Sequence, residues 1–386
     1  MEQVDVLIVG GGLIGLSLAA ALRNSSLKVI VVDQQPIPSA PESLNKTRED
    51  NTLRSGINPR VSALGMTAWN FLTRMGVSVP STCYDNVEVW DSGTGRVGFG
   101  AGEDLGHIVE NNRLVAALIE KANPSLHWAI ELTDIEKVDD GYQVSAGGLS
   151  WHTRLLVGAD GSQSVVRKLA KLPALQWHYD QKAIVTTIET AKPHGNIARQ
   201  WFTENGVLAF LPLADSHLCS IVYSTRDADG ALALDDAAFS EYLGRLSEQT
   251  LGSVLGVDKR FSFPLQQQHS LSYVASGLAL IGDAAHTIHP LAGQGANLGL
   301  GDAACLSMVI TQARLEGRSP GDPVLLKRYQ RERAQDNVAT AALMEIFFRG
   351  FGSQNSGVKW LRSRGMKVVD DSPLLKSMIK RFATSR

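Results

Sequence analysis

The sequence predicts an α/β protein in which a mainly antiparallel β-sheet is inserted into a parallel sheet, followed by a C-terminal helical segment. Three observations lead to this fold class. A buried strand, a glycine-rich turn and a helix open the chain over residues 4–22. Short β-type runs without helical periodicity then fill residues 183–223. A further buried strand at 278–281 returns the chain to the first sheet, because continuous apolar runs are typical of strands buried on both faces.

The composition limits the size and class of the protein. Its 386 residues predict two to three domains. The 37 Lys and Arg residues nearly balance the 39 Asp and Glu residues, so charge does not direct the protein to nucleic acid. Three widely spaced cysteines form no C-x-x-C pair, so we expect neither a disulfide framework nor a metal site. Without a membrane-spanning apolar run or a basic leader, we expect a cytoplasmic protein.

The opening βαβ unit carries a dinucleotide-binding pattern. Asp33 ends its second strand, where a carboxylate can accept hydrogen bonds from a ribose. In a G-x-G-x-x-G turn, the first glycine permits the tight turn, the second lets the backbone approach a pyrophosphate, and the third lets the helix pack on the strand. The three glycines are Gly10, Gly12 and Gly15. The predicted elements are a strand at 4–9, a helix at 13–22 and a strand at 28–32.

The middle of the chain changes character twice. Residues 62–72 show helical spacing, and residues 151–158 form a strand that leads into an Asp-Gly corner at Asp160 and Gly161. Turn residues then separate four short runs, which predicts antiparallel strands of an inserted sheet. These runs are 183–189, 198–202, 206–211 and 218–223.

A second glycine-rich turn follows the returning strand. Gly282 and Asp283 form a corner after this buried strand, where an Asp is placed to hydrogen-bond a polyol such as the ribityl chain of a flavin. The turn at 293–297 then opens a helix, whose N–H groups and dipole favour an anion such as reduced flavin. A simple NAD dehydrogenase needs neither feature, so the sequence favours a flavoprotein. The candidate cofactor residues of this turn are Gly293, Gly295, Ala296 and Asn297.

Together, the three motifs at 10–15, 158–167 and 282–299 resemble the class A flavoprotein aromatic hydroxylases. The stretch from His289 to Asp302 is similar to the signature of the ubiquinone-biosynthesis hydroxylases within that class. The chain most resembles their bacterial 2-octaprenylphenol hydroxylase branch, through the stretches 106–111, 198–200, 206–213 and 217–222. The resemblance implies a Rossmann-like FAD-binding domain (1–72, 100–172 and 270–340), a substrate domain (73–99 and 173–269) and a C-terminal helical basic segment (341–386).

The resemblance also implies roles for individual residues around FAD. Asp33 would bind the adenosine ribose, and Asp283 the ribityl chain. Arg60 matches an arginine that contacts the cofactor near its phosphates, and Asn111 stands where many class members carry Arg or Gln. The corner at Asp160 and Gly161 matches a motif linked to FAD and nicotinamide binding, which implies NADPH or another electron donor.

The resemblance gives little direct catalytic work to side chains. Pro290 would form the wall beside the reactive flavin carbon. His286 and His289 lie in the same turn, and both positioning and proton handling are open for them. Arg199 and Trp201, on a predicted strand of the inserted sheet, are candidate substrate contacts. The alternative is an edge strand with a solvated Arg and a core Trp.

The implied activity is an FAD-dependent aromatic monooxygenase reaction that proceeds through a flavin C4a-hydroperoxide. The implied substrates are O2 and a polyprenylated phenol, with hydroxylation at C5 of 2-octaprenylphenol in ubiquinone biosynthesis. Another ring position of the same pathway and a small soluble phenol are open alternatives. A non-enzymatic alternative is a flavin-bearing structural subunit of a ubiquinone-biosynthesis complex.

The C-terminal segment is basic, with nine Lys and Arg residues and two Asp residues between Arg349 and Arg386. Its last part has an apolar helical face (Leu374, Leu375, Met378, Ile379 and Phe382). Such a helix either packs on its own domain or contacts an anionic membrane or a partner. Peripheral contact with the inner membrane, association with other ubiquinone-biosynthesis proteins and a homo-oligomer are therefore open.

Overall fold

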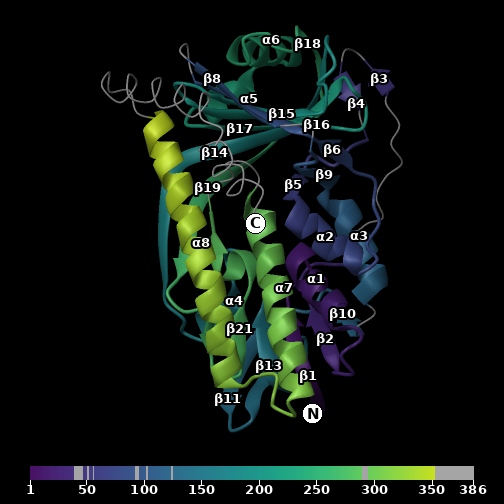
Figure 1. Ribbon diagram of the computed structural model, residues 1–386, viewed down its shortest axis with the longest axis vertical. Coiled ribbons are helices and arrows are strands. Elements are labelled where there is room, and N and C mark those ends of the chain that lie inside the picture. The colour runs from purple at the N-terminus through teal and green to yellow at the C-terminus, as the bar shows by residue number, and fades with distance from the viewer. Residues whose placement is uncertain are drawn as a thin grey trace.

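Two large β-sheets form the framework of the protein, with helices packed around them (Figure 1). The structure is a computed structural model that describes most of the chain. Among the helices of the described residues, none is long and apolar enough to cross a membrane. The described residues are 1–38, 47–49, 52–54, 56–91, 95–100, 103–122, 125–288 and 294–352.

The first sheet has eight strands, in the order β10-β2-β1-β13-β12-β11, with β21 beside β13 and β20 beside β21. Strands β10, β2, β1, β13 and β21 run parallel, whereas β12, β11 and β20 run antiparallel to their neighbours. The bounds are β1 Glu2–Val9, β2 Val29–Val32, β10 Ser125–His127, β11 Leu132–Val138, β12 Gly141–Ala146, β13 Leu149–Gly158, β20 Val274–Ala275 and β21 Leu278–Leu280.

The carboxyl ends of four parallel strands meet at one edge of this sheet. The register pairs Val9 of β1 with Val32 of β2 and with Gly158 of β13. Gly158 in turn pairs with Leu280 of β21. The three motifs predicted to bind a dinucleotide therefore leave the sheet side by side, in the crevice where open α/β sheets bind ligands.

Helices cover this sheet and bury its apolar side chains. Helix α1 packs between α7 and α3, and α8 packs along α7 (Figure 1). A Cβ added at Gly299 of α7 would lie 2.8 Å from Ile14 Cδ1, so glycine permits this close approach. The helices are α1 Leu13–Leu22, α2 Met66–Arg74, α3 Asn111–Ala122, α4 Val165–Leu169, α5 Ala228–Ala233, α6 Asp236–Leu246, α7 Gln294–Leu315 and α8 Pro323–Gly352, with a 3-10 turn η1 at Gly282–Ala284.

The second sheet has nine strands and is antiparallel except where β15 runs parallel to β7. Its order is β22-β19-β14-β17-β16-β15-β7-β8, with β18 beside β14. Helices α5 and α6 bury one of its faces. The bounds are β7 Asn86–Asp91, β8 Gly95–Gly100, β14 Ala174–Thr190, β15 Ile197–Phe202, β16 Gly206–Pro212, β17 Leu218–Thr225, β18 Val254–Val257, β19 Phe261–Ser270 and β22 His286–Thr287.

A smaller three-stranded sheet connects the two large ones and corrects one expectation. Residues 62–65 belong to strand β5, and helix α2 begins only at Met66. Strand β5 pairs with the distant β9, a contact that helical spacing in the local sequence does not reveal. The bounds are β5 Val61–Gly65, β6 Thr82–Tyr84 and β9 Gly106–Glu110, and a separate hairpin pairs β3 Thr47–Glu49 with β4 Thr52–Arg54.

The α/β fold with an inserted, mainly antiparallel sheet is confirmed. The exact domain boundaries stay a proposal. Strands β7 and β8, from the first hundred residues, join the second sheet beside β15. Helix α8 continues to Gly352, and the remainder of the predicted segment 341–386 lies outside the described residues.

Candidate active site

The turn between β1 and α1 is built for close backbone approach. Gly10 has a φ of +116°, and a Cβ there would lie 2.3 Å from the Ala159 carbonyl oxygen. A Cβ at Gly15 would lie 2.0 Å from the Gly10 carbonyl oxygen, so this glycine lets α1 pack on the turn. Gly12 differs, because a Cβ there would meet nothing within 4 Å. Packing within the protein explains Gly10 and Gly15 but not Gly12.

The start of α1 also suits an anion. Its N-cap, Gly12, provides no side-chain hydrogen bond, and the first turn of the helix holds no acidic residue. Its first N–H groups therefore point out of the helix at the open space beside Gly12. Asp33 lies next to this turn, and its carboxylate accepts hydrogen bonds from the Gly11 N–H at 2.6 Å and the Gln35 N–H at 2.7 Å. Each carboxylate oxygen has a further lone pair, so ribose hydroxyls can still donate to it.

The second corner, after β13, holds a helix cap. The Asp160 carboxylate accepts hydrogen bonds from the Ser164 hydroxyl at 2.5 Å and from the Val165 N–H at 2.7 Å. Burial raises the pKa of Asp160, and these hydrogen bonds partly offset that effect. Its carboxylate is thus committed to the start of α4. Gly161 follows with a φ of +79° and open space around the position of a Cβ.

Arg167 connects the second corner to the third. This buried side chain donates from Nη1 to the Ala284 carbonyl oxygen at 2.7 Å. Its Nη2 donates to Gln268 Oε1 on β19 at 2.9 Å. One arginine therefore joins α4, the turn η1 and the second sheet, which fixes the relative position of the two corners.

The third corner presents an unpaired carboxylate. No described residue donates a hydrogen bond to the Asp283 carboxylate, whose side chain reaches solvent. Enough protein surrounds it that desolvation raises its pKa, more strongly than His286 lowers it. Gly282 beside it has a φ of +58°, and a Cβ there would lie 3.2 Å from Ile14. Asp283 is therefore available to polyol hydroxyls, as predicted for a ribityl chain.

We predict that Asp283→Ala raises the Kd for the flavin about 10- to 150-fold, because a hydrogen bond to a charged group contributes about 1.5–3 kcal/mol. The free energy of unfolding of the apoprotein should stay equal or rise, since a partly desolvated carboxylate is removed. Flavin titration and urea unfolding measure the two quantities, and Asp283→Asn is the matched control that keeps an acceptor. Undiminished flavin affinity in Asp283→Ala would contradict the placement.

The start of α7 is anchored to β5 by Asn297. Its Oδ1 accepts from the Gly65 N–H at 2.9 Å, and its Nδ2 donates to the Ala63 carbonyl oxygen at 2.8 Å. The Asn297 side chain thus holds the helix in place. A Cβ at Gly295 would meet nothing within 4 Å, and the neighbouring Ala296 is half-buried.

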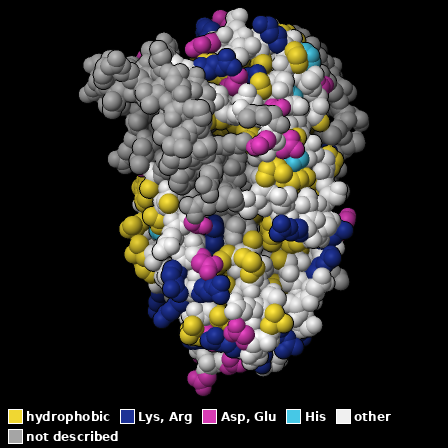
Figure 2. All heavy atoms as spheres, in the orientation of Figure 1, with side chains coloured by type: hydrophobic (Ala, Val, Ile, Leu, Met, Phe, Trp, Pro, Cys, Tyr) yellow, Lys and Arg dark blue, Asp and Glu magenta, His cyan; other side chains and the backbone are white. Residues whose placement is uncertain are grey.

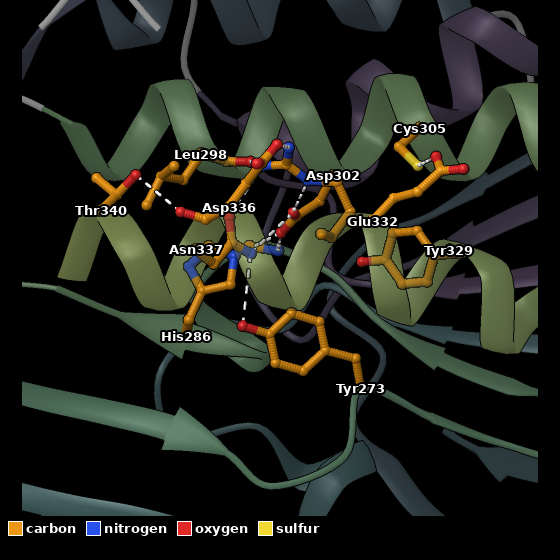
Figure 3. Close-up of polar contacts among 12 residues, drawn as sticks. Tyr273, His286, Leu298, Asp302, Cys305, Tyr329, Glu332, Asp336, Asn337 and Thr340 are labelled. Carbon is orange, nitrogen blue, oxygen red and sulfur yellow. Dashed lines mark hydrogen bonds and ion pairs between the residues drawn. The ribbon is translucent and has the colours of Figure 1, made fainter. Parts of the chain in front are cut away.

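A buried polar network lies directly behind the third corner (Figure 3). Asp302 of α7 is fully buried, and its Oδ2 accepts from the Gly282 N–H at 3.0 Å and from His286 Nε2 at 2.6 Å. Its Oδ1 accepts from Arg333 Nε at 2.8 Å and Asn337 Nδ2 at 3.2 Å, both on α8. Burial alone would raise the pKa of Asp302, but His286 and Arg333 outweigh it and lower the pKa. One carboxylate therefore positions the corner that carries Asp283.

A partial signal for this network is present in the sequence. His286 was an open case, and its bond to Asp302 indicates a positioning role. Arg333 and Asn337 were not predicted. Tyr329, Arg333 and Asn337 follow one another at intervals of four residues, so they lie on one side of α8. Polar residues in line with a buried aromatic residue are the sequence signal that could have identified Arg333 and Asn337.

Acid should weaken this network. Since the folded pKa of Asp302 is depressed, its contribution to stability is complete above the unfolded value of about 3.9 and is lost as the pH falls through the lower folded value. We expect the difference in free energy of unfolding between the wild type and Asp302→Asn to shrink below about pH 4. Urea unfolding of the FAD-loaded proteins between pH 6 and 3 measures it. A difference that stays constant over this range would contradict the assignment.

A cavity of about 290 Å3 lies between the motif crevice and the second sheet. Arg60, Asn111 and Gln294 line it on the crevice side. The Asn111 N–H donates to the Arg60 carbonyl oxygen at 3.0 Å, which holds these two predicted residues together. The cavity is mainly apolar, with few polar groups, as is usual for small-molecule sites. Its sheet-side lining includes Val87, Val185, Gln200, Val207, Ala209, Leu211, Val222, Ser224 and Phe263.

The candidate substrate contacts on β15 lie differently from our expectation. Trp201 is buried on the opposite face of the sheet, stacked on Trp90 at 4.9 Å between ring centroids, and does not line the cavity. Arg199 borders the cavity, but its guanidinium bonds to Glu88 at 3.1 Å and to the His194 carbonyl oxygen at 2.6 Å. Successive side chains of a strand point to opposite faces. Ala198 and Gln200, and not Trp201, are therefore the residues on the cavity face of this strand.

Three predicted residues lie outside the described part of the chain: His289, Pro290 and Gly293. Their predicted roles beside the flavin stay predictions. Both flanking residues are placed, since Ile288 follows β22 and Gln294 begins α7 and lines the cavity.

Comparison with known proteins now decides the family. The sequence profile described as "FAD binding domain" matches residues 112–345, which is more than half of the chain. The chain belongs to the FAD-dependent monooxygenases. A profile described as "NAD(P)-binding Rossmann-like domain" matches residues 8–55, the turn and helix that contain Gly12. FAD is thus the cofactor of this monooxygenase, with a nicotinamide as reductant.

The full length of the monooxygenase is similar to known hydroxylases. It is 31% identical to 3-demethoxyubiquinol 3-hydroxylase of Escherichia coli, covering 99% of this chain and 98% of that protein. It is 33% identical to the ubiquinone hydroxylase UbiL of Rhodospirillum rubrum, covering 99% and 90%. The crystal structure of p-nitrophenol 4-monooxygenase PnpA from Pseudomonas putida superposes with a TM-score of 0.79 at 17% identity, covering all of both chains. That likeness shows the shared fold.

The residues of the monooxygenase fit FAD. Open space beside Gly12 and Gly295 would admit the pyrophosphate and the flavin against two helix starts. The half-buried Asp33 and Asp283, which accepts no hydrogen bond from a described residue, are spaced along the crevice for the ribose and the ribityl chain. Arg60 and Asn111 border the cavity where the crevice opens toward the second sheet. We therefore propose that these residues hold FAD, with its ring system at the cavity.

Proposed function

We propose that this monooxygenase hydroxylates the aromatic ring of a polyprenylated phenol in ubiquinone biosynthesis, at C5 of 2-octaprenylphenol. The observation that carries the proposal is an apolar cavity at the flavin end of an FAD crevice, in a chain similar over its whole length to ubiquinone hydroxylases. The E. coli relative is named for ring position 3 and does not support C5. The choice of C5 therefore rests on the resemblance to the bacterial 2-octaprenylphenol hydroxylase branch alone.

The chain's own residues orient the ring and exclude water. The sheet wall supplies Val185, Val222 and Leu211, whose apolar side chains would pack against the ring. Gln200 and Ser224 are the polar groups on that wall that can hydrogen-bond a phenolic hydroxyl. Asn111 and Arg60 face them from the crevice side. A ring between these walls lies against the position proposed for the flavin.

FAD supplies the redox chemistry that activates O2 when it is bound. The protein then needs no strong acid or base of its own. At the described cavity wall, Arg199 is paired with Glu88, and an arginine keeps its proton in such a pair. What the protein contributes is a dry, shaped chamber. Because FAD supplies the chemistry and the protein supplies the cavity, we propose that hydroxylation depends mainly on the apolar cavity walls and not on a catalytic pair of side chains.

The proposal is tested by the lipids of a source strain that lacks this gene, grown with vigorous aeration and profiled by mass spectrometry. Loss of ubiquinone, with accumulation of a polyprenylphenol or a ring product without the C5 oxygen, is the expected result. Accumulation of another intermediate would move the reaction to another ring position. Unchanged ubiquinone, together with turnover of small phenols by the purified protein, would overturn the proposal.

A further inference from the structure

A second cavity, of about 160 Å3, forms a groove between α2, α7 and α8, on the other side of the α7 start from the ring cavity. Its apolar described lining comes from all three helices: Ala68, Phe71, Leu298, Leu300, Ala304 and Ala339. The charged side chains at its border are already committed, since Arg333 bonds to Asp302 at 2.8 Å and to Asp336 at 3.3 Å. The groove therefore suits an apolar ligand and not an ion.

The groove and the ring cavity meet at one side chain. Gln294, the first residue of α7, lines both of them and is buried. Beside Gln294, the Asn297 side chain lines the groove and donates a hydrogen bond to the carbonyl oxygen of Ala63, which lines the ring cavity. This bond joins α7 to β5 and separates the two spaces. Gln294 is therefore the described side chain that the two spaces share.

The apolar lining of the groove continues along the outside of α7. From Gln294 to Ala304 the helix rises about 15 Å. Beyond Ala304, Met308 and Leu315 lie on the same side of the helix, and they are 64% and 84% exposed. Figure 2 shows hydrophobic side chains along α7 on this face. Met308 and Leu315 thus continue the apolar side of α7 beyond the groove.

We propose that this groove holds the first isoprene units of the substrate's polyprenyl tail while the phenol ring lies in the ring cavity, with Gln294 at the passage between them. The inference rests on the proposed function and names where the tail leaves the site. The ring cavity is closed toward the sheet by packed side chains, so a long tail needs an exit. Removing the methylene groups of the tail from water stabilises the complex, which makes an apolar groove a source of affinity for tailed phenols.

The chain offers a matched pair of variants for the test. Ala339 lines the groove and Val338 does not, yet both are exposed and adjacent on α8. Ala339→Trp should fill the groove, while Val338→Trp places the same side chain outside it. We expect the ratio of kcat/KM for a farnesylated phenol to that for the tailless phenol to fall at least 10-fold in Ala339→Trp and to keep the wild-type value in Val338→Trp. An unchanged ratio in Ala339→Trp would overturn the proposal.

Photo-crosslinking separates this inference from the proposed function. The probe is farnesol carrying a diazirine, which has a tail but no ring to hydroxylate, and it is added to the FAD-loaded full-length protein. Adducts on α2, α7 or α8 that disappear in Ala339→Trp support the groove even if no prenylphenol is hydroxylated, in which case only the proposed function fails. Adducts confined to the second sheet, in a protein that does hydroxylate prenylphenols, overturn the groove alone.

Discussion

Gly12→Ala should lose FAD while keeping its fold. Gly12 has ordinary extended backbone angles, with φ of −81° and ψ of −174°, and a Cβ there meets no protein atom within 4 Å. The substitution should therefore change the free energy of unfolding of the apoprotein by no more than about 1 kcal/mol. The new methyl group points at the space where the pyrophosphate would approach the start of α1. Loss of hydrogen bonds to a charged group costs about 1.5–3 kcal/mol, or about 10- to 150-fold in Kd.

The measurement is a fluorescence titration with FAD, alongside circular dichroism and thermal unfolding of the apoprotein. Gly15→Ala is the contrasting variant, because its Cβ would lie 2.0 Å from the Gly10 carbonyl oxygen and must displace α1. We expect that variant to lose both stability and FAD. Wild-type FAD affinity in Gly12→Ala would show that the pyrophosphate does not bind at the start of α1.

Asp302→Asn should be the most destabilising single change in the site. The Asp302 carboxylate accepts hydrogen bonds from two donors on each oxygen. An asparagine presents an NH2 group to one of these pairs and leaves the mostly buried Arg333 with the half-exposed Asp336 as its remaining described opposite charge. Removing one partner of a buried ion pair costs about 3–5 kcal/mol of unfolding free energy. FAD affinity should also fall about 10-fold or more, because the Gly282 N–H and His286 are no longer held.

Two further variants separate stability from positioning. Asp336→Asn removes the other, half-exposed partner of Arg333 and should cost less than about 1 kcal/mol. The double variant Asp302→Leu with Arg333→Met removes both buried charges and should recover much of the stability. It should not recover FAD affinity, since the corner at Gly282 still lacks its acceptor. Full recovery of both, or no loss in Asp302→Asn, would contradict a positioning role for Asp302.

The fold was predictable wherever local patterns decide the structure. The strand, turn and helix around Gly10 and Gly15 follow from an apolar run, three glycines and a helical stretch that are adjacent in the sequence, and α1 lies where it was predicted. The helical spacing of residues 62–72 predicts helix where strand β5 lies, because the partner strand β9 is remote in the sequence and the local spacing carries no sign of that pairing. Tertiary context overrides local preference in such cases.

The site was predictable in its main-chain parts and less so in its side chains. Glycine positions report backbone geometry directly, and the structure places Gly10, Gly161 and Gly282 at positive φ. Asp160 and Asn297 were assigned to the cofactor, yet their side chains hold α4 and β5 in place. Which face of a strand lines the cavity is harder to predict from the sequence. Alternation along β15 separates Gln200 from Trp201 but cannot tell which face α5 and α6 cover.

The most direct test of the central claim is oxygen transfer by the purified protein. FAD-loaded enzyme, NADPH and 18O2 are incubated with a short-tailed polyprenylphenol, and the products are analysed by mass spectrometry. The account predicts one 18O atom on the aromatic ring, dependent on FAD and the reductant. Oxidation of NADPH that yields only hydrogen peroxide, with no labelled ring product from any prenylphenol tried, would contradict it.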